Sequence, residues 1–222
     1  MSGSDVIRTD DDLKHWLEVE EWYMSSHTRE WLQRTDPREA SDALARVAEG
    51  ADREPNTAWS AIATNIAMSG FAPGGAIAGP GPGTRKAGVR AALMLEKAGD
   101  PRAVAPLARA FAAPGSRQTQ YQGLIEEALS RALARAEAIS ADDVADVLDL
   151  ARRAWSSRPG RDLAPLHADI VASALPLLAP HPSAAPLLRA IAADDARGAA
   201  ARGANRKRVR EVAARESSTT IR

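Results

Sequence analysis

The stretch KAGVRAALMLEKAGDPRAVAPLARAFAA, from Lys86 to Ala113, decides the fold of this chain. Its apolar residues recur at helical spacing on both sides of a short break, which predicts two helices joined by a sharp corner. Gly99 stands where a helix needs a left-handed residue after its last turn. Asp100 and Pro101 follow as an N-cap and a first-turn residue for the next helix. The sequence therefore predicts a helix pair with these three residues at its corner.

This corner resembles a known repeat. The run Gly99-Asp100-Pro101-Arg102-Ala103-Val104, followed by Pro106-Leu107, is similar to the corner of a HEAT-like repeat of the phycobilisome-lyase subtype. The clear similarity covers roughly 28 of the 222 residues. In that family two antiparallel helices form a unit, and the units stack into a curved rod whose inner helices carry recognition. The resemblance thus implies a helical-repeat fold and leaves the activity open.

Two other segments echo the corner. The run Thr35-Asp36-Pro37-Arg38-Glu39-Ala40 repeats the Asp-Pro-Arg start, and the segment from Ile170 to Ile191 repeats the order of apolar and proline residues found from Val89 to Phe111, with a gap of one residue. His181 takes the place of the capping aspartate there. The resulting fold prediction is all-α, as a short α-solenoid of degenerate HEAT-like helix pairs. An irregular helical bundle with one repeat-like corner is the alternative.

Length and composition narrow the class of protein. The chain has 222 residues, a formal net charge of zero and no cysteine. The length suffices for one core, the balanced charge argues against nucleic-acid binding by the whole surface, and the lack of cysteine excludes disulfides and thiolate metal sites. No apolar run approaches the ~18 residues of a membrane helix, and the polar N-terminus does not resemble a signal peptide. A cytoplasmic protein with no membrane contact is expected.

We expect three regions along the chain: a disordered N-terminus at 1–9, a HEAT-like helical domain at 10–195, and a basic C-terminal arm or tail at 196–222. Strand signals are almost absent. The helices of the domain are predicted from apolar periodicity and capping signals, at 10–32, 36–50, 57–69, 86–98, 101–113, 117–138, 140–155, 162–176 and 183–193.

The segment from Pro55 to Thr84 contains no charged residue, although 26% of the whole chain is charged. It is therefore predicted to be buried or to lie at an interface. Its Gly/Pro-rich part, 71–84, is predicted to be a connecting loop or a partner-binding loop, and Pro80 and Pro82 lack the N–H groups that a phosphate cradle needs. The candidate partner surface combines an outward-facing tryptophan of the first helix with residues of the uncharged segment: Trp22, Trp59, Asn65, Met68 and Phe71.

Beyond Asp195 the chain becomes basic. Up to Arg215 it carries a single acid, Glu211, and seven cations: Arg197, Arg202, Arg206, Lys207, Arg208, Arg210 and Arg215. With few large aliphatic residues, this segment is predicted to be a solvated, partly helical tail. The alternative is an arm that binds nucleic acid or an acidic protein surface.

No motif indicates chemistry. The histidines pair with carboxylates on a helix face only as His15/Glu18 and His27/Glu30, with no third ligand and no metalloprotease spacing. No catalytic residue, cofactor site or metal site is predicted. The leading hypothesis is a non-enzymatic protein–protein interaction or scaffold module. The alternatives are a nucleic-acid-associated protein that uses the basic arm and, less favoured, an enzyme of unrecognised type.

Overall fold

The computed structural model describes residues 7–19, 26–49, 84–112, 122–194 and 203–219. Within these ranges the regular structure is entirely helical, which confirms the all-α class. None of the helices in these ranges has the length and apolar character needed to cross a membrane. The elements are, in order, α1 (Asp10–Val19), α2 (Ser26–Arg34), α3 (Pro37–Ala48), α5 (Thr84–Ala98), the 3₁₀ turn η1 (Pro101–Ala103), α6 (Val104–Ala112), α7 (Gln122–Arg135), α8 (Val144–Trp155), α9 (Pro165–Leu178), the 3₁₀ turn η3 (Pro182–Ala184), α10 (Ala185–Ala192) and α12 (Ala204–Thr219).

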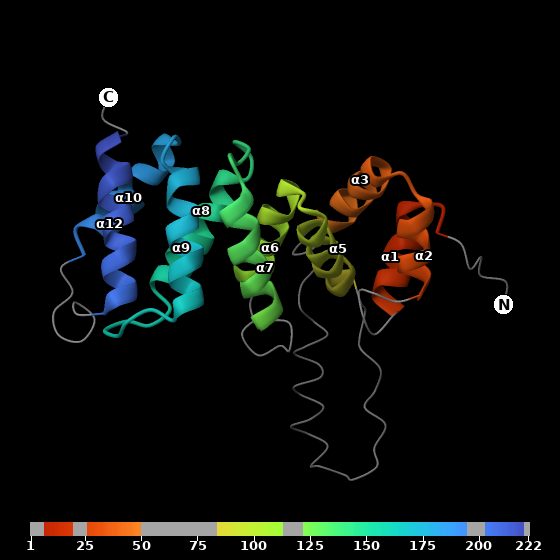
Figure 1. Cartoon of the computed structure of the whole chain (residues 1–222), viewed down its shortest axis with the longest axis horizontal. Coiled ribbons are helices and arrows are strands. Elements are labelled where there is room, and N and C mark those ends of the chain that lie inside the picture. The colour runs from red at the N-terminus through yellow and green to blue at the C-terminus, as the bar shows by residue number, and fades with distance from the viewer. Residues whose placement is uncertain (1–6, 20–25, 50–83, 113–121, 195–202, 220–222) are drawn as a thin grey trace, which may run out of the picture.

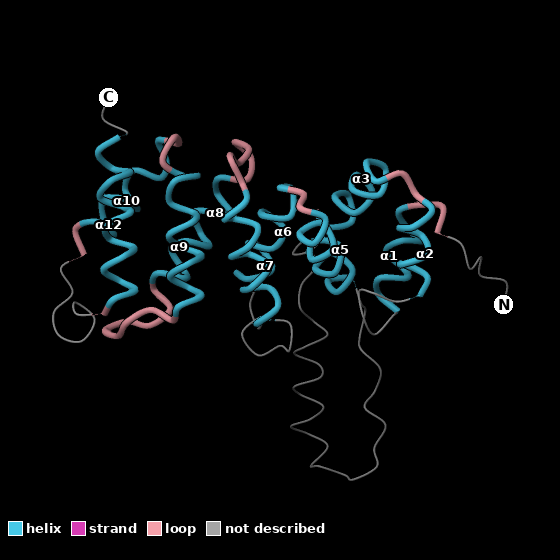
Figure 2. Tube along the Cα trace, in the orientation of Figure 1, coloured by secondary structure: helices cyan, strands magenta, loops and turns pink. Residues whose placement is uncertain are grey.

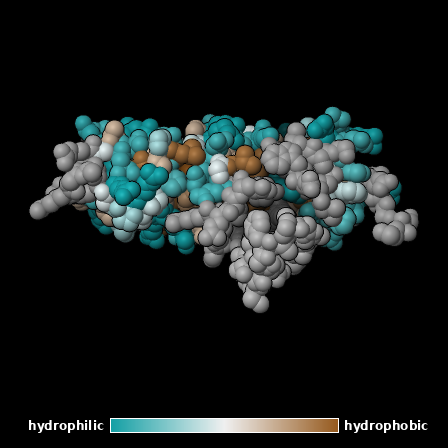
Figure 3. Space-filling model, turned by 90° about the horizontal axis from the view of Figure 1, so that it is seen from below, coloured by the Kyte–Doolittle hydropathy of each residue, from teal (hydrophilic) through white to brown (hydrophobic). Residues whose placement is uncertain are grey.

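The helices stand side by side in an elongated row (Figures 1 and 2). One layer of the row consists of α1, α5, α7, α9 and α12, each packed on the next. The second layer consists of α6, α8 and α10, with α3 packed on α1 and α5 at the N-terminal end. Helices that are close in the chain are thus close in space. Seen from below, the described surface is mostly hydrophilic, with a few apolar side chains near the middle of the row (Figure 3).

The corner predicted at Gly99 forms as expected. Gly99 has a φ of 79°, and its N–H bonds the Glu96 carbonyl at 3.0 Å while the Asp100 N–H bonds the Leu95 carbonyl at 3.0 Å. These two bonds form a Schellman motif. The Asp100 carboxylate then accepts the Arg102 N–H at 2.9 Å. The one departure is that the second helix begins with the 3₁₀ turn η1 before α6 starts.

The centre of the row is α5. Every side chain described from Ala87 to Glu96 is buried, because α1, α3, α6 and α7 all pack around this helix. A helix covered on every side must be apolar around its whole circumference. Those ten residues meet this requirement except for Arg90 and Glu96, which are 3% and 2% exposed. Both of these charges must therefore be satisfied inside the protein.

The N-terminal region differs from the sequence prediction in two ways. Instead of one helix over 10–32, α1 and α2 are separate and pack against each other. Trp16 stacks on His27 with ring centroids 3.9 Å apart, whereas residues eleven apart on one straight helix would lie ~16 Å apart along its axis. Residues 7–9 are also not disordered: Ile7 is buried, and Thr9 and Asp12 exchange backbone-to-side-chain hydrogen bonds as an N-terminal capping box.

Helix boundaries elsewhere shift by a few residues. The α7 helix ends at Arg135 and not at residue 138, and α8 begins at Val144, after a turn stabilised by Ser140 and Asp143. Pro176 lies inside α9, which continues to Leu178. The prediction that Asp162 opens a helix was wrong, because α9 begins only at Pro165 and the Asp162 carboxylate instead accepts N–H groups of α12.

The largest difference concerns the predicted C-terminal tail. Residues 204–219 form α12, which packs on α9 and α10 at the end of the row (Figure 1). Val209 and Ala213 are fully buried, and Arg206, one turn before Val209, is only 5% exposed. The inward face of α12 thus combines small apolar side chains with one buried arginine. A count of large aliphatic residues therefore underestimates how much of this helix is buried.

Candidate functional site

The predicted partner surface cannot be placed. Its five residues, Trp22, Trp59, Asn65, Met68 and Phe71, all lie outside the described residues, as do the expected helix at 57–69 and the loop up to residue 83. Of the seven cations of the predicted arm, Arg197 and Arg202 also lie outside. The candidate surfaces within the described residues are α12, the corner at Gly99, and the edge where α7 and α9 begin and α8 ends, at the bottom of Figure 1.

Arg206 anchors α12 to the rest of the protein. Its guanidinium donates to the carbonyls of Arg161 at 2.7 Å, Arg158 at 3.0 Å and Trp155 at 3.2 Å. It also lies over the Trp155 ring, 4.4 Å from the centroid, as a cation–π pair. Trp155 is the last residue of α8, so this arginine satisfies one carbonyl that the helix itself leaves without a partner.

The other described cations of the predicted arm also have partners within the protein. Arg208 bonds Asp169 of α9 at 2.5 Å, and Arg210 donates to the Asp194 carbonyl at 2.8 Å. Lys207 and Arg215 face carboxylates of their own helix, Glu211 and Glu216, at 4.0 and 3.1 Å. These neighbours compensate much of the positive charge of α12.

Asp162, in the loop before α9, caps the N-terminus of α12 from outside the helix. Its carboxylate accepts the N–H of Arg206 at 3.0 Å and of Asn205 at 3.4 Å. Burial alone would raise the pKa of Asp162, but these backbone hydrogen bonds, that of Leu163 and the Arg206 charge outweigh it and lower the pKa. The carboxylate lies so close to Gly203 that a Cβ atom there would be 2.3 Å from the Asp162 carboxyl carbon.

We expect Gly203→Ala to loosen α12, because contact at that distance must displace either the Asp162 cap or the helix itself. The matched control is Gly123→Ala in α7, where an added Cβ meets nothing within 4 Å and the substitution should stabilise the helix by about 0.5–1 kcal/mol. Hydrogen exchange of the α12 amides measures the effect directly. Unchanged exchange in the Gly203 variant would contradict the close approach.

Arginines that cap neighbouring helices recur along the row. Arg90 of α5 donates to the Leu17 carbonyl in the last turn of α1, and Arg135 of α7 donates to the Glu96 carbonyl in the last turn of α5 at 2.8 Å. Arg206 and Arg210 do the same beyond the ends of α8 and α10. A cation at a helix C-terminus also opposes the negative end of the helix dipole. The contacts of Arg90, Arg135 and Arg206 join residues 39–73 positions apart in the chain, and no sequence pattern predicted them.

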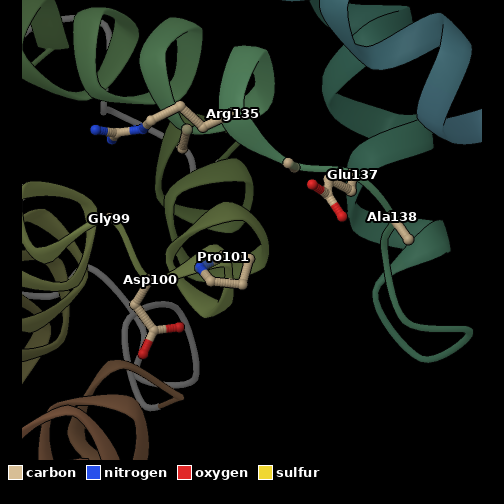
Figure 4. A pocket seen from close by; sticks show the side chains of 8 residues that line it. Gly99, Asp100, Pro101, Arg135, Glu137 and Ala138 are labelled. Carbon is tan, nitrogen blue, oxygen red and sulfur yellow. The ribbon is translucent and has the colours of Figure 1, made fainter.

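The corner at Gly99 forms one side of a small cleft of about 240 Å³. Asp100 and Pro101 lie on one side, and Glu137 and Ala138, just after α7, lie on the other (Figure 4). Burial would raise the pKa of Asp100, but the side chain and the N–H of Arg102 outweigh it and lower the pKa. Asp100 and Asp42, a residue of α3, both accept hydrogen bonds from Arg102 and raise its pKa. Asp100, on one wall of the cleft, is thus bonded to Arg102, which in turn pairs with α3.

Asp100→Ala should lower the free energy of unfolding by about 1 kcal/mol, the usual loss for an N-cap. The matched variant is Asp142→Ala, because Asp142 is exposed in the turn before α8 and lies outside the corner. Denaturant midpoints of the two variants give the comparison. Equal shifts would mean that the Asp100 cap has no special weight in this fold.

A second polar cluster lies at the lower ends of three helices. His167 of α9 places Nδ1 2.8 Å from the Ser157 hydroxyl, just after α8, and Nε2 3.2 Å from the Glu126 carboxylate of α7. Gln122 donates to the same carboxylate at 2.8 Å, and the Phe111 ring meets the imidazole edge to face at 5.8 Å. No sequence motif indicates this cluster, since its three members are separated by ten to forty-one residues.

No group of three or more metal-ligating side chains occurs among the described residues. His15 and Glu18, and His27 and Glu30, which share helix faces in the sequence, do not extend to such a group. In comparisons with protein-family models, with curated proteins and with solved structures, no match to the chain was found.

Proposed function

We propose that this chain is a short α-solenoid of degenerate HEAT-like helix pairs that serves as a protein–protein interaction or scaffold module. The observation that carries the proposal is the two-layer row, in which α5 packs on α6, α6 on α7, α8 on α9 and α10 on α12. An array built this way offers a long surface for its chain length, which suits recognition of an extended partner.

The second corner supports a repeat. His181 stands where Asp100 stands in the first corner, and Pro182–Ala184 form a 3₁₀ turn that leads into α10, as Pro101–Ala103 lead into α6. The His181 side chain makes no capping hydrogen bond. From this position into the following helix the backbone path is thus similar although the cap is lost, as expected for a degenerate copy. One position earlier the corners differ, because Pro180 stands where Gly99 has a positive φ.

The end of the row also supports the proposal. Repeat arrays need a terminal unit whose outer face is polar, because the last apolar face would otherwise meet water. The α12 helix buries Val209 and Ala213 against the row. It turns its charged side chains to solvent, namely Lys207, Arg208, Glu211 and Arg215.

Ion pairs join successive helices and stiffen the surface. Asp10 pairs with Arg46 between α1 and α3, Asp42 with Arg102 between α3 and η1, and Arg109 with Asp146 between α6 and α8. The separations of these three pairs are 2.5, 2.7 and 2.9 Å. A surface that is already ordered loses less entropy on binding. The corner cleft, held by the Arg102 pairs, is the described part that we assign to the partner.

The test is affinity capture from the native host with the immobilised full chain, followed by mass spectrometry, with and without nuclease. The expected result is a protein retained in a fixed ratio that survives nuclease and moderate salt. Ala138→Trp should abolish retention because it fills the cleft. Ala134→Trp, at an exposed alanine of α7 that does not line the cleft, should leave retention unchanged.

Two results would overturn the proposal. One is retention of nucleic acid alone, with an affinity that falls steeply as salt rises. The other is equal loss of the protein partner in both tryptophan variants. The nucleic-acid alternative receives little support from the described cations of α12, since Arg206 is buried and Arg208, Arg210 and Arg215 face carboxylates or carbonyls.

A further inference from the structure

We propose that Ser157 is a nucleophile for acyl transfer from small carboxylic esters, with His167 as its base and Glu126 as the group that positions the imidazole. This activity lies beyond the proposed binding role and does not depend on it. The observation behind it is the continuous chain of contacts Ser157 Oγ to His167 Nδ1 at 2.8 Å and His167 Nε2 to Glu126 Oε1 at 3.2 Å. A hydroxyl, a base and an orienting carboxylate within hydrogen-bond reach are the signature of an activated nucleophile.

Each member of the cluster is held by a separate element. Glu126 comes from α7 and is fixed by the Gln122 amide at 2.8 Å, while His167 lies in the first turn of α9 with the Phe111 ring against it. Ser157 lies in the turn after α8, where its hydroxyl is also 2.8 Å from the Ala154 carbonyl. A base whose ring is oriented by packing on one side and a carboxylate on the other needs little reorganisation to accept a proton.

The hydroxyl proton of Ser157 has two acceptors at equal distance, the Ala154 carbonyl and His167 Nδ1. When the hydroxyl proton points to the Ala154 carbonyl, His167 Nδ1 carries its own proton and donates it to the Ser157 oxygen. When it points to Nδ1, the imidazole is neutral at that atom and Nε2–H donates to Glu126. Only the second arrangement leaves His167 able to remove the proton. Reaching it from the first takes loss of the Nδ1 proton to solvent, with Nε2 protonated, as well as rotation about the Cβ–Oγ bond.

The reaction proceeds by two balanced steps. Ser157 Oγ bonds to the ester carbonyl carbon while its proton moves to Nδ1, and the departing alkoxide takes that proton as the carbon–oxygen bond breaks. Water then attacks the acyl-serine, passes a proton to Nδ1, and the proton returns to Oγ as the carboxylic acid leaves. The Glu126 carboxylate stabilises the imidazolium formed in each step. The two ring nitrogens exchange the roles that they have in chymotrypsin-like triads, and the roles rather than the positions define such a site.

The cluster is open to a small reagent. The side chains of His167 and Glu126 are 14% and 15% exposed, so both reach the surface at the lower edge of the row. That edge holds the ends of α7, α8 and α9 (Figure 1). This degree of access favours small esters over bulky ones.

The experiment is labelling of the full chain with a small fluorophosphonate, with the modified residue identified by mass spectrometry, together with release of nitrophenol from p-nitrophenyl acetate. Modification of Ser157 is expected, and Ser157→Ala should abolish it. The matched control is Ser156→Ala, since Ser156 is the exposed neighbour and its loss should leave labelling unchanged. His167→Gln should slow labelling about a hundredfold or more, the usual contribution of a general base.

Glu126→Gln separates positioning from structure. It keeps the side-chain shape, so the melting temperature should change little while the labelling rate falls at least tenfold. A purely structural role predicts the reverse, with a lower melting temperature and no effect on the rate at Ser157. Failure to label Ser157 above the level of Ser156, in a protein whose circular dichroism is native, would overturn the proposal.

Discussion

Arg206→Ala is expected to lower the free energy of unfolding by about 3 kcal/mol. The substitution removes a donor from three carbonyl groups, those of Trp155, Arg158 and Arg161. The Arg158 carbonyl keeps the Arg161 N–H at 3.2 Å, whereas a buried acceptor left without a partner costs about 1–3 kcal/mol. The substitution also removes a cation–π contact, which contributes about 1 kcal/mol. Water that reaches the exposed carbonyls offsets part of these losses. The expected total of about 3 kcal/mol is therefore smaller than the sum of the separate contributions.

Lys207→Ala is the matched control for Arg206. It removes a neighbouring cation of the same helix, but Lys207 is exposed and its only described partner, Glu211, is 4.0 Å away, so the change should stay within about 0.5 kcal/mol. Urea unfolding followed by circular dichroism gives both values, and hydrogen exchange shows whether α12 opens before the rest. Equal effects of the two substitutions would mean that Arg206 does not anchor the helix.

Glu96→Ala is expected to lower the free energy of unfolding by about 3 kcal/mol. Glu96 is 2% exposed and bonds two arginines of α7, Arg131 at 3.0 Å and Arg135. Removing one partner of a buried ion pair typically costs about 3–5 kcal/mol. The expected loss lies at the lower end of this range, because Arg131 and Arg135 are about half exposed and can turn to water when Glu96 is removed.

The chain offers a control that uses the same arginine. Glu127 lies 3.8 Å from Arg131 and is 61% exposed, so Glu127→Ala should cost no more than about 0.5 kcal/mol. Denaturant midpoints measured at neutral pH compare the two. A loss at Glu127 as large as that at Glu96 would argue that burial of the carboxylate is not what makes the pair important.

The lowered pKa of Glu96 predicts how the free energy of unfolding depends on pH. Burial would raise the pKa of Glu96, but the hydrogen bonds and charges of Arg131 and Arg135 outweigh it, so the pKa in the folded protein lies below 4.5. A carboxylate with a lowered pKa contributes its full stabilisation above its unfolded pKa and loses it as pH falls through the folded pKa. The difference in stability between wild type and Glu96→Ala should therefore be constant above about pH 5 and shrink below pH 4.5.

Local signals in the sequence predicted local structure well. The Gly99 turn and the Asp100 cap follow from residues adjacent in the chain, and the structure confirms them. The structure also places an N-cap at Asp36, in the second Asp-Pro-Arg run, and apolar faces on α3 and α6. The break between α1 and α2 was missed because the apolar pattern runs through it. The stacking of Trp16 on His27 shows that the two helices are separate, and this contact forms only in the folded protein.

Contacts across long sequence distances were not predicted. Arg90 meets a carbonyl 73 residues away, and Arg206 meets carbonyls 45–51 residues away. Arg206 was predicted to belong to a solvated tail or a nucleic-acid arm, and no role was predicted for Arg90, although it stands between apolar residues in Gly88-Val89-Arg90-Ala91. The Ser157–His167–Glu126 cluster was missed for the same reason, since it exists only where three helix ends meet.

The arrangement in which each helix touches mainly its neighbours in the chain has a kinetic consequence. Short sequence separation between contacting elements means that little loop-closure entropy is lost before contacts form, and chains of this kind fold fast. The α5 helix packs on α6 after a single turn, whereas α1 and α3 join it across more than thirty residues of chain. The α5/α6 pair is therefore the expected nucleus, from which order spreads helix by helix. The arginine that reaches back from α12 to the carbonyls after α8 should then form last, so that the C-terminal helix opens and closes many times for each complete unfolding of the protein.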